Sequence, residues 1–452
     1  MELINKKVLV VGLGTTGIAT SLFLKEKGAK VTVSEIRSED ELLPTVQRFR
    51  NLGIKVEAKE HKRETFLSSD LIVVSPGVPL YSPSLKAAAE AGVEIISEIE
   101  LAYRHIKTPI IAVTGTNGKT TTVNLIADIF ESSGKSVFLG GNVGTPLIEY
   151  VLNHHDENYI IAEISSFQLE GIQSFKPYIS VLLNLQHDHL DRYSSYEDYV
   201  AAKARIFMNQ SNNEYAILNA DDLEVKKLSS SIKASTLYFN YEKEVPYGIY
   251  YKNHFLYFNN GSGQIRFALD NLHLKGIHNL HNIMAAVAIS KICGCPQERI
   301  QKTIDNFKGL PHRLELFKES HQIKFYNDSK ATNVGSAISA LEALDPPLIL
   351  IAGGKDKGCD YNPLTPFIKE KVKALILLGE AKEKMHQALK SSASISLVET
   401  LEDAVKLSFK KALPGDTILL SPACSSFDMF KNYEERGNVF KTLVNKLTEK
   451  RI

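Results

Sequence analysis

The stretch Ile110-Ile-Ala-Val-Thr-Gly-Thr-Asn-Gly-Lys-Thr-Thr121 decides the fold class of this chain. An apolar run typical of a β-strand ends in two glycines, a lysine and consecutive threonines, and apolar residues then recur at helical spacing from Val123 to Phe130. Backbone N–H groups at a helix start bind phosphate oxygens, a lysine there reaches the outer phosphates, and the next hydroxyl ligates Mg²⁺. The stretch therefore predicts strand, phosphate loop and helix, with Lys119 and Thr120 at a nucleotide site.

The spacing of this loop differs from the Walker pattern, which has four residues between its glycines. Gly115 and Gly118 enclose only two residues, and Val113 stands where the first glycine of that pattern would be. An ordinary glycine-rich turn is the alternative. Because Lys119 and Thr120 stand where the helix begins, we interpret the loop as a phosphate site.

Length and composition indicate a globular protein with several domains. The 452 residues correspond to about three domains of ordinary size. The formal net charge of +1 gives no sign of a nucleic-acid or membrane partner, and no apolar run approaches the roughly 18 residues of a membrane span. The cysteines lack the spacing of a metal site, and they are Cys293, Cys295, Cys359 and Cys424. We expect a cytoplasmic protein.

Residues 1–105 alternate strand and helix patterns. A strand at Val8–Val11 precedes Gly12-Leu-Gly-Thr-Thr-Gly17, and Glu35 follows the next strand. This is the arrangement of a Rossmann-like dinucleotide fold. Read alone, it predicts NAD with Glu35 on a ribose, but glycines at such a turn serve any nucleotide phosphate. Because a second nucleotide loop follows, ATP plus one nucleotide-carrying substrate is the favoured pair.

Residues 106–309 form the predicted second domain. A strand pattern ends in Glu163, and a later one leads to His187-Asp-His-Leu-Asp191. A carboxylate at a strand end beside a phosphate loop suits Mg²⁺, whereas a solvent-facing carboxylate and structural loop histidines are the alternatives. Residues 215–275 are rich in strand patterns. Gly276–Asn282 then opens a helix whose Asn and His residues are either caps or ligand contacts.

Lys203 falls within the apolar stripe of a predicted helix. Ser195 and Asp198 resemble the box that caps such a helix. The stripe consists of Tyr196, Tyr199, Val200, Ile206 and Phe207. A lysine at an apolar position either leads its ammonium out to water or serves a site. The pattern leaves both interpretations open.

Residues 310–452, the predicted third domain, again alternate strands and helices. Three polar loops follow strand patterns, and they are Asn327–Asn333, Gly353–Gly358 and Ser421–Phe427. Loops after the carboxyl ends of parallel strands are where α/β sheets bind ligands. We therefore expect the three loops to form one polar site, with ordinary surface loops as the alternative.

Taken together, these motifs resemble those of the Mur ligases, over the whole chain and all three predicted domains. The phosphate loop Thr114–Thr120 has the short spacing of that superfamily, which folylpolyglutamate synthetases share. The more specific motifs are Ser165-Ser-Phe-Gln-Leu-Glu170, Asp188-His-Leu-Asp-Arg-Tyr193, Leu310-Pro-His-Arg313, Asn327-Asp-Ser-Lys-Ala-Thr-Asn333 and Ser421-Pro-Ala-Cys-Ser-Ser426. The motif at 327–333, and the lack of an Asp-Asn-Pro-Arg motif, resemble the branch that adds D-glutamate to UDP-N-acetylmuramoyl-L-alanine.

The resemblance implies an α/β fold of three domains. A Rossmann-like N-terminal domain (1–105) would bind the UDP substrate, a central P-loop ATPase-like domain (106–309) would bind ATP, and a Rossmann-like C-terminal domain (310–452) would bind the amino acid. It also implies an ATP-dependent ligase that uses two Mg²⁺ ions and an acyl phosphate in a cytoplasmic step of peptidoglycan synthesis. A monomer that acts on small molecules, with no nucleic-acid or membrane partner, is expected.

The resemblance further implies roles for individual residues. The UDP group would contact Thr15, Thr16, Glu35, Arg37, Gly77 and Asn142. ATP would contact Gly115, Thr116, Asn117, Gly118, Lys119, Thr120, Thr121, Asn279, Arg313 and Asp328. The metal ligands would be Thr120, Glu163, His189 and a carbamylated Lys203. D-glutamate would contact Thr332, Lys357, Ser426 and Tyr433. The catalytic set would be Lys119, Lys203, His189 and Lys330.

The sequence departs from the family pattern at Glu35–Ile36–Arg37, where Asp-Thr-Arg is expected, and at Tyr433, where phenylalanine is expected. The implied carbamate also accounts for a lysine among metal ligands. A free ammonium, with an ordinary pKa of about 10.4, would repel a divalent cation. Addition of CO₂ converts it to an anionic oxygen ligand suited to Mg²⁺.

Other function classes remain open at this point. A folylpolyglutamate-type ligase would share the loop and the Mg²⁺ chemistry, but the G-x-G-x-x-G domain argues against it. A NAD-dependent dehydrogenase would need a hydride-transfer pocket, which the motifs do not indicate. A non-catalytic binding module is disfavoured by the many residues of ligand-binding type.

Overall fold

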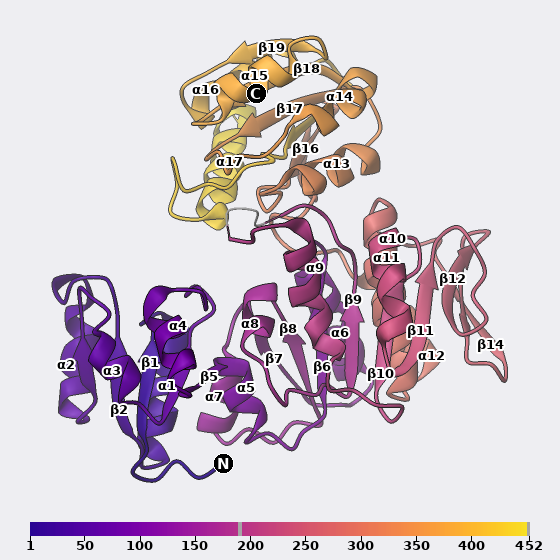
Figure 1. Cartoon of the computed structure of the whole chain (residues 1–452). Coiled ribbons are helices and arrows are strands. Elements are labelled where there is room, and N and C mark those ends of the chain that lie inside the picture. The colour runs from indigo at the N-terminus through magenta and orange to yellow at the C-terminus, as the bar shows by residue number, and fades with distance from the viewer. Residues whose placement is uncertain (189–191, 450–452) are drawn as a thin grey trace. The chain divides into compact units, whose positions relative to one another are not determined.

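The computed structural model describes residues 1–188 and 192–449, in which three β-sheets carry helices on their faces (Figure 1). The described residues form two compact units. The first contains Met1–Leu185, Arg192–Asp270 and His281–Ile304, and the second contains the other described segments. The first two sheets belong to the first unit and the third sheet to the second.

The first sheet is parallel and has five strands in the order β3-β2-β1-β4-β5. Its strands are β1 Lys7–Val11, β2 Lys30–Ser34, β3 Lys55–Glu57, β4 Leu71–Val74 and β5 Glu94–Ser97. Its helices are α1 Thr15–Glu26, α2 Leu43–Asn51, α3 Arg63–Leu67, α4 Pro83–Glu90 and α5 Glu98–Tyr103. Residues 8–11 and 71–74 are continuous apolar runs because both faces of a parallel sheet are covered. A Cβ at Gly17 would lie 1.9 Å from the Gly12 carbonyl oxygen, so α1 can pack against β1 only with glycine there.

The second sheet has nine strands in the order β14-β13-β12-β11-β10-β9-β6-β8-β7. Its strands are β6 Ile110–Thr114, β7 Val137–Gly141, β8 Tyr159–Glu163, β9 Ile179–Leu182, β10 Tyr215–Asn219, β11 Ser235–Asn240, β12 Gly248–Lys252, β13 Phe255–Asn259 and β14 Gln264–Ala268. Its helices are α6 Lys119–Ser132, α7 Leu147–Leu152, α8 Ser166–Glu170, α9 Tyr196–Ala204, α10 Leu223–Leu228, α11 Ile277–Ile292 and α12 Gln297–Asn306. The seven neighbouring strands β12, β11, β10, β9, β6, β8 and β7 are parallel. The strands β13 and β14 extend the sheet beyond β12 as antiparallel strands.

The third sheet has six strands in the order β15-β16-β20-β17-β18-β19. Its strands are β15 Glu315–Ser320, β16 Ile323–Asn327, β17 Leu348–Gly353, β18 Val372–Leu378, β19 Ser394–Leu397 and β20 Thr417–Leu420. Its helices are α13 Val334–Ala343, α14 Thr365–Lys371, α15 Lys382–Leu389, α16 Leu401–Lys411 and α17 Tyr433–Glu449. Because β16, β20 and β17 are parallel neighbours, the three polar loops that follow them begin at the same edge of the sheet.

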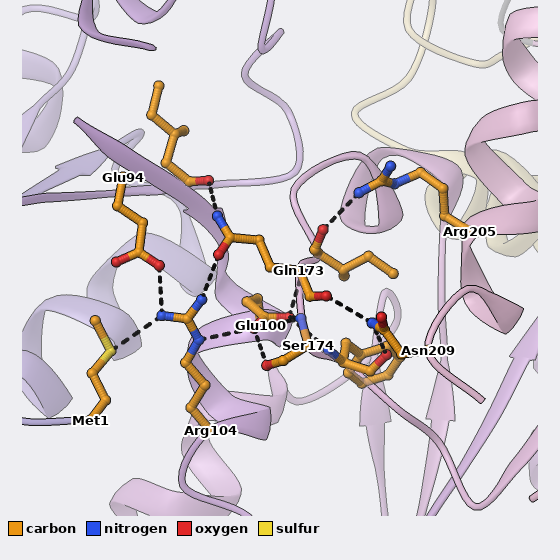
Figure 2. Close-up of polar contacts among 11 residues, drawn as sticks. Met1, Glu94, Glu100, Arg104, Gln173, Ser174, Arg205 and Asn209 are labelled. Carbon is orange, nitrogen blue, oxygen red and sulfur yellow. Dashed lines mark hydrogen bonds and ion pairs between the residues drawn. The ribbon is translucent and has the colours of Figure 1, made fainter. Parts of the chain in front are cut away.

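A polar network around the buried carboxylate of Glu100 joins α5 to the segment after α8 within the first unit (Figure 2). The carboxylate of Glu100 accepts hydrogen bonds from the backbone N–H groups of Gln173, Ser174 and Phe175 at 2.8–3.0 Å. Arg104 Nε donates to the same carboxylate at 2.9 Å. These contacts connect the end of the first sheet's last helix directly to the layer of helices on the second sheet.

The predicted α/β fold is confirmed, and each of the three predicted domain ranges contains one sheet. The proposed boundaries between residues 105 and 106 and between 309 and 310 stay predictions, since residues 271–280 group with the segment that begins at Asp305. Within the described part of the chain, no helix is both long and apolar enough to cross a membrane.

Candidate active site

The phosphate loop connects β6 to α6 as the sequence predicts. Gly115 and Gly118 have φ angles of +148° and +87°, which favour glycine. A Cβ at Gly118 would lie 2.2 Å from Oδ1 of Asn282 in α11. Glycine is therefore required at 118 both by the backbone conformation and by the approach of Asn282.

Two lysines converge on one carbonyl oxygen in this loop. Lys119 Nζ lies 2.9 Å from the Gly115 carbonyl oxygen, and Lys203 Nζ lies 3.0 Å from the same atom. Lys203 is only 2% exposed and its ammonium stands 4.8 Å from the ring centroid of Tyr199. The alternative in which Lys203 leads its ammonium out to water is therefore wrong. Two cations so close together create a strongly positive field, which suits bound anions.

Two of the residues predicted to hold Mg²⁺, Thr120 and Glu163, are in direct contact. Thr120 Oγ1 donates to Glu163 Oε2 at 2.7 Å, and Asn142 Nδ2 donates to Glu163 Oε1 at 3.0 Å. Glu163 comes from the end of β8, the strand beside β6, and is 3% exposed. A hydroxyl and a buried carboxylate are oxygen donors of the kind that Mg²⁺ prefers, so this pair fits the ion.

The structure does not complete the metal site. His189 lies outside the described residues, so its predicted role as a ligand is not placed. Across residues 1–188 and 192–449, no group of three or more His, Cys, Asp or Glu side chains is arranged to hold a metal ion. The ligand set of Thr120, Glu163, His189 and Lys203 stays a prediction.

All six residues predicted to contact the UDP group line one cavity of about 500 Å³ in the first unit, and they are Thr15, Thr16, Glu35, Arg37, Gly77 and Asn142. The cavity also includes His61 and Gln168, which the sequence analysis did not single out as ligand contacts. It extends from the carboxyl ends of β1 and β4 to Asn142, which follows β7. The resemblance to the family thus named a set of residues that the fold brings together, although nothing in their spacing shows this.

The carboxylate of Glu35 accepts hydrogen bonds from other groups of the protein. It accepts from the Leu13 N–H at 2.7 Å, from the Arg37 N–H at 3.1 Å and from Arg37 Nη2 at 2.9 Å. Burial alone would raise the pKa of Glu35, but the hydrogen bonds from Arg37 and Leu13 outweigh it and lower the pKa to about 2. Since this carboxylate holds the glycine turn and Arg37, the interpretation of Glu35 as an acceptor for the ribose of NAD loses its support.

The lowered pKa predicts a contribution of Glu35 to acid stability. The Glu35 pKa is about 2 in the folded chain, against about 4.3 in an unfolded one. The stabilisation is therefore fully present above the unfolded value and is lost as the pH falls towards 2. Urea unfolding between pH 6 and pH 3 should show a steeper loss of stability for the unmodified chain than for Glu35→Gln. Parallel pH profiles of the two proteins would contradict this role.

Asp328 lies at the centre of the polar loops of the second unit. Its carboxylate accepts from Ser421 Oγ at 2.8 Å and from the Leu314 N–H at 3.0 Å, which joins the loops after β16 and β20. Burial raises the pKa of Asp328 to about 7, although these hydrogen bonds oppose the shift. The Ser421 contact joins two of the three loops, and the Lys355 N–H donates to the Ser425 carbonyl at 3.0 Å, which brings the third loop to the second. That the three loops form one ligand site stays a prediction.

The residues predicted to contact D-glutamate lie on these same loops and on α17. Lys330 Nζ stands 3.8 Å from the ring centroid of Tyr433. Ser426 is 1% exposed, and within the described part of the chain its Oγ finds no hydrogen-bond partner. Lys357 is exposed, and Thr332 is half-buried. A buried hydroxyl left without a protein partner suits a polar ligand.

The predicted adenosine contacts are only partly described by the structure. Asn279 is 7% exposed, and its side-chain Nδ2 donates to the Lys275 carbonyl at 2.8 Å. Asn282 approaches the phosphate loop, where Thr122 Oγ1 donates to its Oδ1 at 3.3 Å. The sequence motif assigned the ATP contact to Asn279, and it left Asn282 among the residues of 276–282 that are either caps or ligand contacts.

Arg436 is a further residue whose contacts the sequence motifs did not predict. It lies on α17, is 3% exposed, and donates to the carbonyl oxygens of Ser329, Cys424 and Ser425 at 2.8–3.2 Å. The surrounding Glu434-Glu-Arg-Gly437 reads as a solvent-facing helix, so no local signal marked it.

Comparison with known proteins identifies the family. Three family models match the chain: "Mur ligase MurD-like, N-terminal domain" over residues 6–97, "Mur ligase middle domain" over 113–290 and "Mur ligase, glutamate ligase domain" over 312–424. A UDP-N-acetylmuramoylalanine--D-glutamate ligase from Geotalea uraniireducens is 48% identical over 449 residues, which cover 99% of each chain. The chain belongs to the Mur ligases. A ligase of the same name from Citrifermentans bemidjiense is 47% identical over 98% of each chain.

Solved structures agree with the fold of this Mur ligase. The MurF ligase of Thermotoga maritima in complex with ADP aligns with a TM-score of 0.64 at 16% identity and covers all of both chains. A pseudomurein peptide ligase type C from Methanothermus fervidus gives a TM-score of 0.62 at 21% identity, over 98% of this chain and all of that one. Mur ligases are ATP-dependent ligases that form amide bonds, so the predicted enzyme class is confirmed and the dehydrogenase alternative is wrong.

Proposed function

We propose that this Mur ligase joins the amine of D-glutamate to the carboxylate of UDP-N-acetylmuramoyl-L-alanine, in a cytoplasmic step of peptidoglycan synthesis. The observation that carries the proposal is the match over 99% of both chains to a relative named for this reaction. The cavity that contains all six predicted UDP contacts supports a nucleotide-carrying substrate. A monomer is part of the proposal.

The chemistry requires ATP because a carboxylate and an ammonium do not condense in water. An oxygen of the substrate carboxylate attacks the γ-phosphorus, the bond to ADP breaks, and an acyl phosphate forms. The amine nitrogen of D-glutamate, having lost a proton, then attacks the acyl carbon. The C–O bond to phosphate breaks, and the products are the amide, ADP and phosphate.

The first unit supplies the groups for phosphoryl transfer. The N-terminus of α6 and Lys119 bind and orient the ATP phosphates. Thr120 and Glu163 would hold Mg²⁺ together with His189 and a carbamylated Lys203, and a second ion would share this set. When bound, Mg²⁺ neutralises the negative charge of the transferring group.

The second unit supplies the groups for the amino acid and the nucleoside. A dicarboxylate such as D-glutamate needs cations and hydrogen-bond donors, which Lys330, Lys357 and the buried hydroxyl of Ser426 offer. Thr332 and Tyr433 would shape the same pocket. The buried Asp328 would accept a ribose hydroxyl beside Arg313.

Phosphate release from ATP tests the proposal directly. The purified enzyme should release phosphate only when UDP-N-acetylmuramoyl-L-alanine and D-glutamate are both present. L-Glutamate, L-alanine and L-lysine serve as matched amino acids, because they share the amine and differ in configuration or side chain. Turnover without a preference for D-glutamate would refute the assignment of the substrate.

A further inference from the structure

The guanidinium of Arg192 donates hydrogen bonds to three consecutive backbone carbonyls in the wall of the UDP cavity. Its Nη1 donates to the carbonyl oxygens of Pro76 at 3.2 Å and Gly77 at 3.3 Å, and its Nη2 donates to that of Val78 at 3.2 Å. The three carbonyls belong to the loop after β4, and all three residues line the cavity. Arg192 itself comes from the segment before α9, far away in the sequence.

Two residues of α8, Phe167 and Glu170, contact the guanidinium of Arg192. Its Nη2 forms an ion pair with Glu170 Oε2 at 2.9 Å, and its Cζ lies 4.2 Å from the ring centroid of Phe167. Tyr193 OH donates to the other oxygen of Glu170 at 2.6 Å. The side chains of Arg192 and Glu170 are 10% and 16% exposed, so water screens this pair little. Arg192 therefore links the loop after β4 to α8.

The hydrogen bonds from Arg192 determine which way the peptide groups of residues 76–78 point. In a trans peptide the N–H points opposite to the C=O of the preceding residue. Since the Pro76 carbonyl points at Arg192, the Gly77 N–H points away from it. The Val78 N–H is already bonded to the Ser75 carbonyl at 3.0 Å. A Cβ built on Gly77 would meet nothing within 4 Å, so open space adjoins this residue.

We propose that Arg192 is a positioning residue for the UDP substrate. Arg192 binds the carbonyl oxygens of residues 76–78, so these partly negative oxygens point towards Arg192 and not into the cavity. The Gly77 N–H then points towards the diphosphate of the substrate. This inference rests on the proposed function only for the identity of the substrate. The contact with the loop is independent of it.

The test compares Arg192→Lys with Arg205→Lys. Lysine keeps the charge but cannot hold three carbonyls with one planar fork or stack on Phe167 in the same way. Arg205, labelled in Figure 2, is a matched control because it also donates to backbone carbonyls. These are the carbonyls of Leu169 at 2.8 Å and Ile172 at 2.6 Å, and neither residue lines the cavity.

In Arg192→Lys, the KM for UDP-N-acetylmuramoyl-L-alanine should rise about tenfold, which corresponds to one charge-assisted hydrogen bond, while the KM for ATP stays unchanged. Amide hydrogen exchange of a peptide covering residues 76–81 should speed up in this variant and not in Arg205→Lys. Glu170→Gln, which leaves Arg192 unpaired, should shift the same KM in the same direction by a smaller factor.

The inference is overturned if the KM values for both substrates rise together, or if Arg205→Lys changes the KM for the UDP substrate as much as Arg192→Lys does. An unchanged exchange rate in residues 76–81 would overturn it as well. An unmodified enzyme without turnover would instead refute the proposed function, and the exchange measurement would still decide whether Arg192 holds the loop.

Discussion

Lys203→Ala should lower turnover about a hundred- to a thousandfold, the range expected for a group that stabilises charge in the transition state. Lys203 is buried, and its nitrogen lies 3.0 Å from the Gly115 carbonyl oxygen that also accepts from Lys119. A second free ammonium in this position would repel both Lys119 and Mg²⁺, whereas a carbamate would bind the metal. Release of phosphate in the presence of both substrates measures the loss.

Chemical rescue distinguishes a carbamylated Lys203 from a lysine with a purely structural role. Acetate or formate should restore part of the activity of Lys203→Ala, because a small carboxylic acid can supply the missing anionic oxygen in the space left by the side chain. Lys119→Ala is the matched control. It should also be impaired, but a carboxylic acid cannot replace a lost cation. Full activity of Lys203→Ala, or equal rescue of both variants, would refute the carbamate.

The residues that the sequence placed well are those whose signal is local. The phosphate loop is a strand, two glycines and a helix start within a dozen residues, and the structure has the same elements at the same positions. Lys203 stood out because it interrupts an apolar stripe, and it is indeed buried. In each case a short-range pattern carries the information.

Contacts between distant segments could not be predicted in this way. Asn282 approaches Gly118 from a helix that begins far along the chain, and Arg192 reaches back to residues 76–78. Hydrophobic periodicity records which face of an element is buried, not which element covers it. The resemblance to a family supplied the six cavity residues, which periodicity alone would not have grouped.

The burial of Arg436 is the clearest case of a contact that the local sequence does not predict. A charged residue within Glu434-Glu-Arg-Gly437 reads as solvent-facing because charged side chains are rarely buried. In the structure Gly437 adjoins it, and a Cβ at Gly437 would lie 2.2 Å from Nδ1 of His312. This face of α17 is therefore pressed against the loops of the third sheet, and Arg436 is enclosed with it. Burial lowers the pKa of Arg436 to about 10, so the group stays charged at neutral pH.

Arg436→Met should destabilise the second unit by about 3–5 kcal/mol, the range for removing one partner from a buried polar network. The substitution keeps an apolar chain of similar length but leaves three carbonyl oxygens and the Ser329 hydroxyl without the donor they have now. These groups belong to the loops after β16 and β20, so the loops that carry Asp328 and Ser426 lose their common attachment. Urea unfolding at constant pH measures the effect.

Lys446→Met on the same helix is the matched control for this prediction. Lys446 is exposed, so its replacement should change the free energy of unfolding by less than about 0.5 kcal/mol. Arg436→Lys should fall between the two, because one ammonium can retain part of the charge-assisted hydrogen bonding without the planar fork that spans both loops. If Arg436→Met unfolded at the same urea concentration as Lys446→Met, the two loops would have to be held together by their other contacts, of which the bond from Ser421 to Asp328 at 2.8 Å is the first to examine.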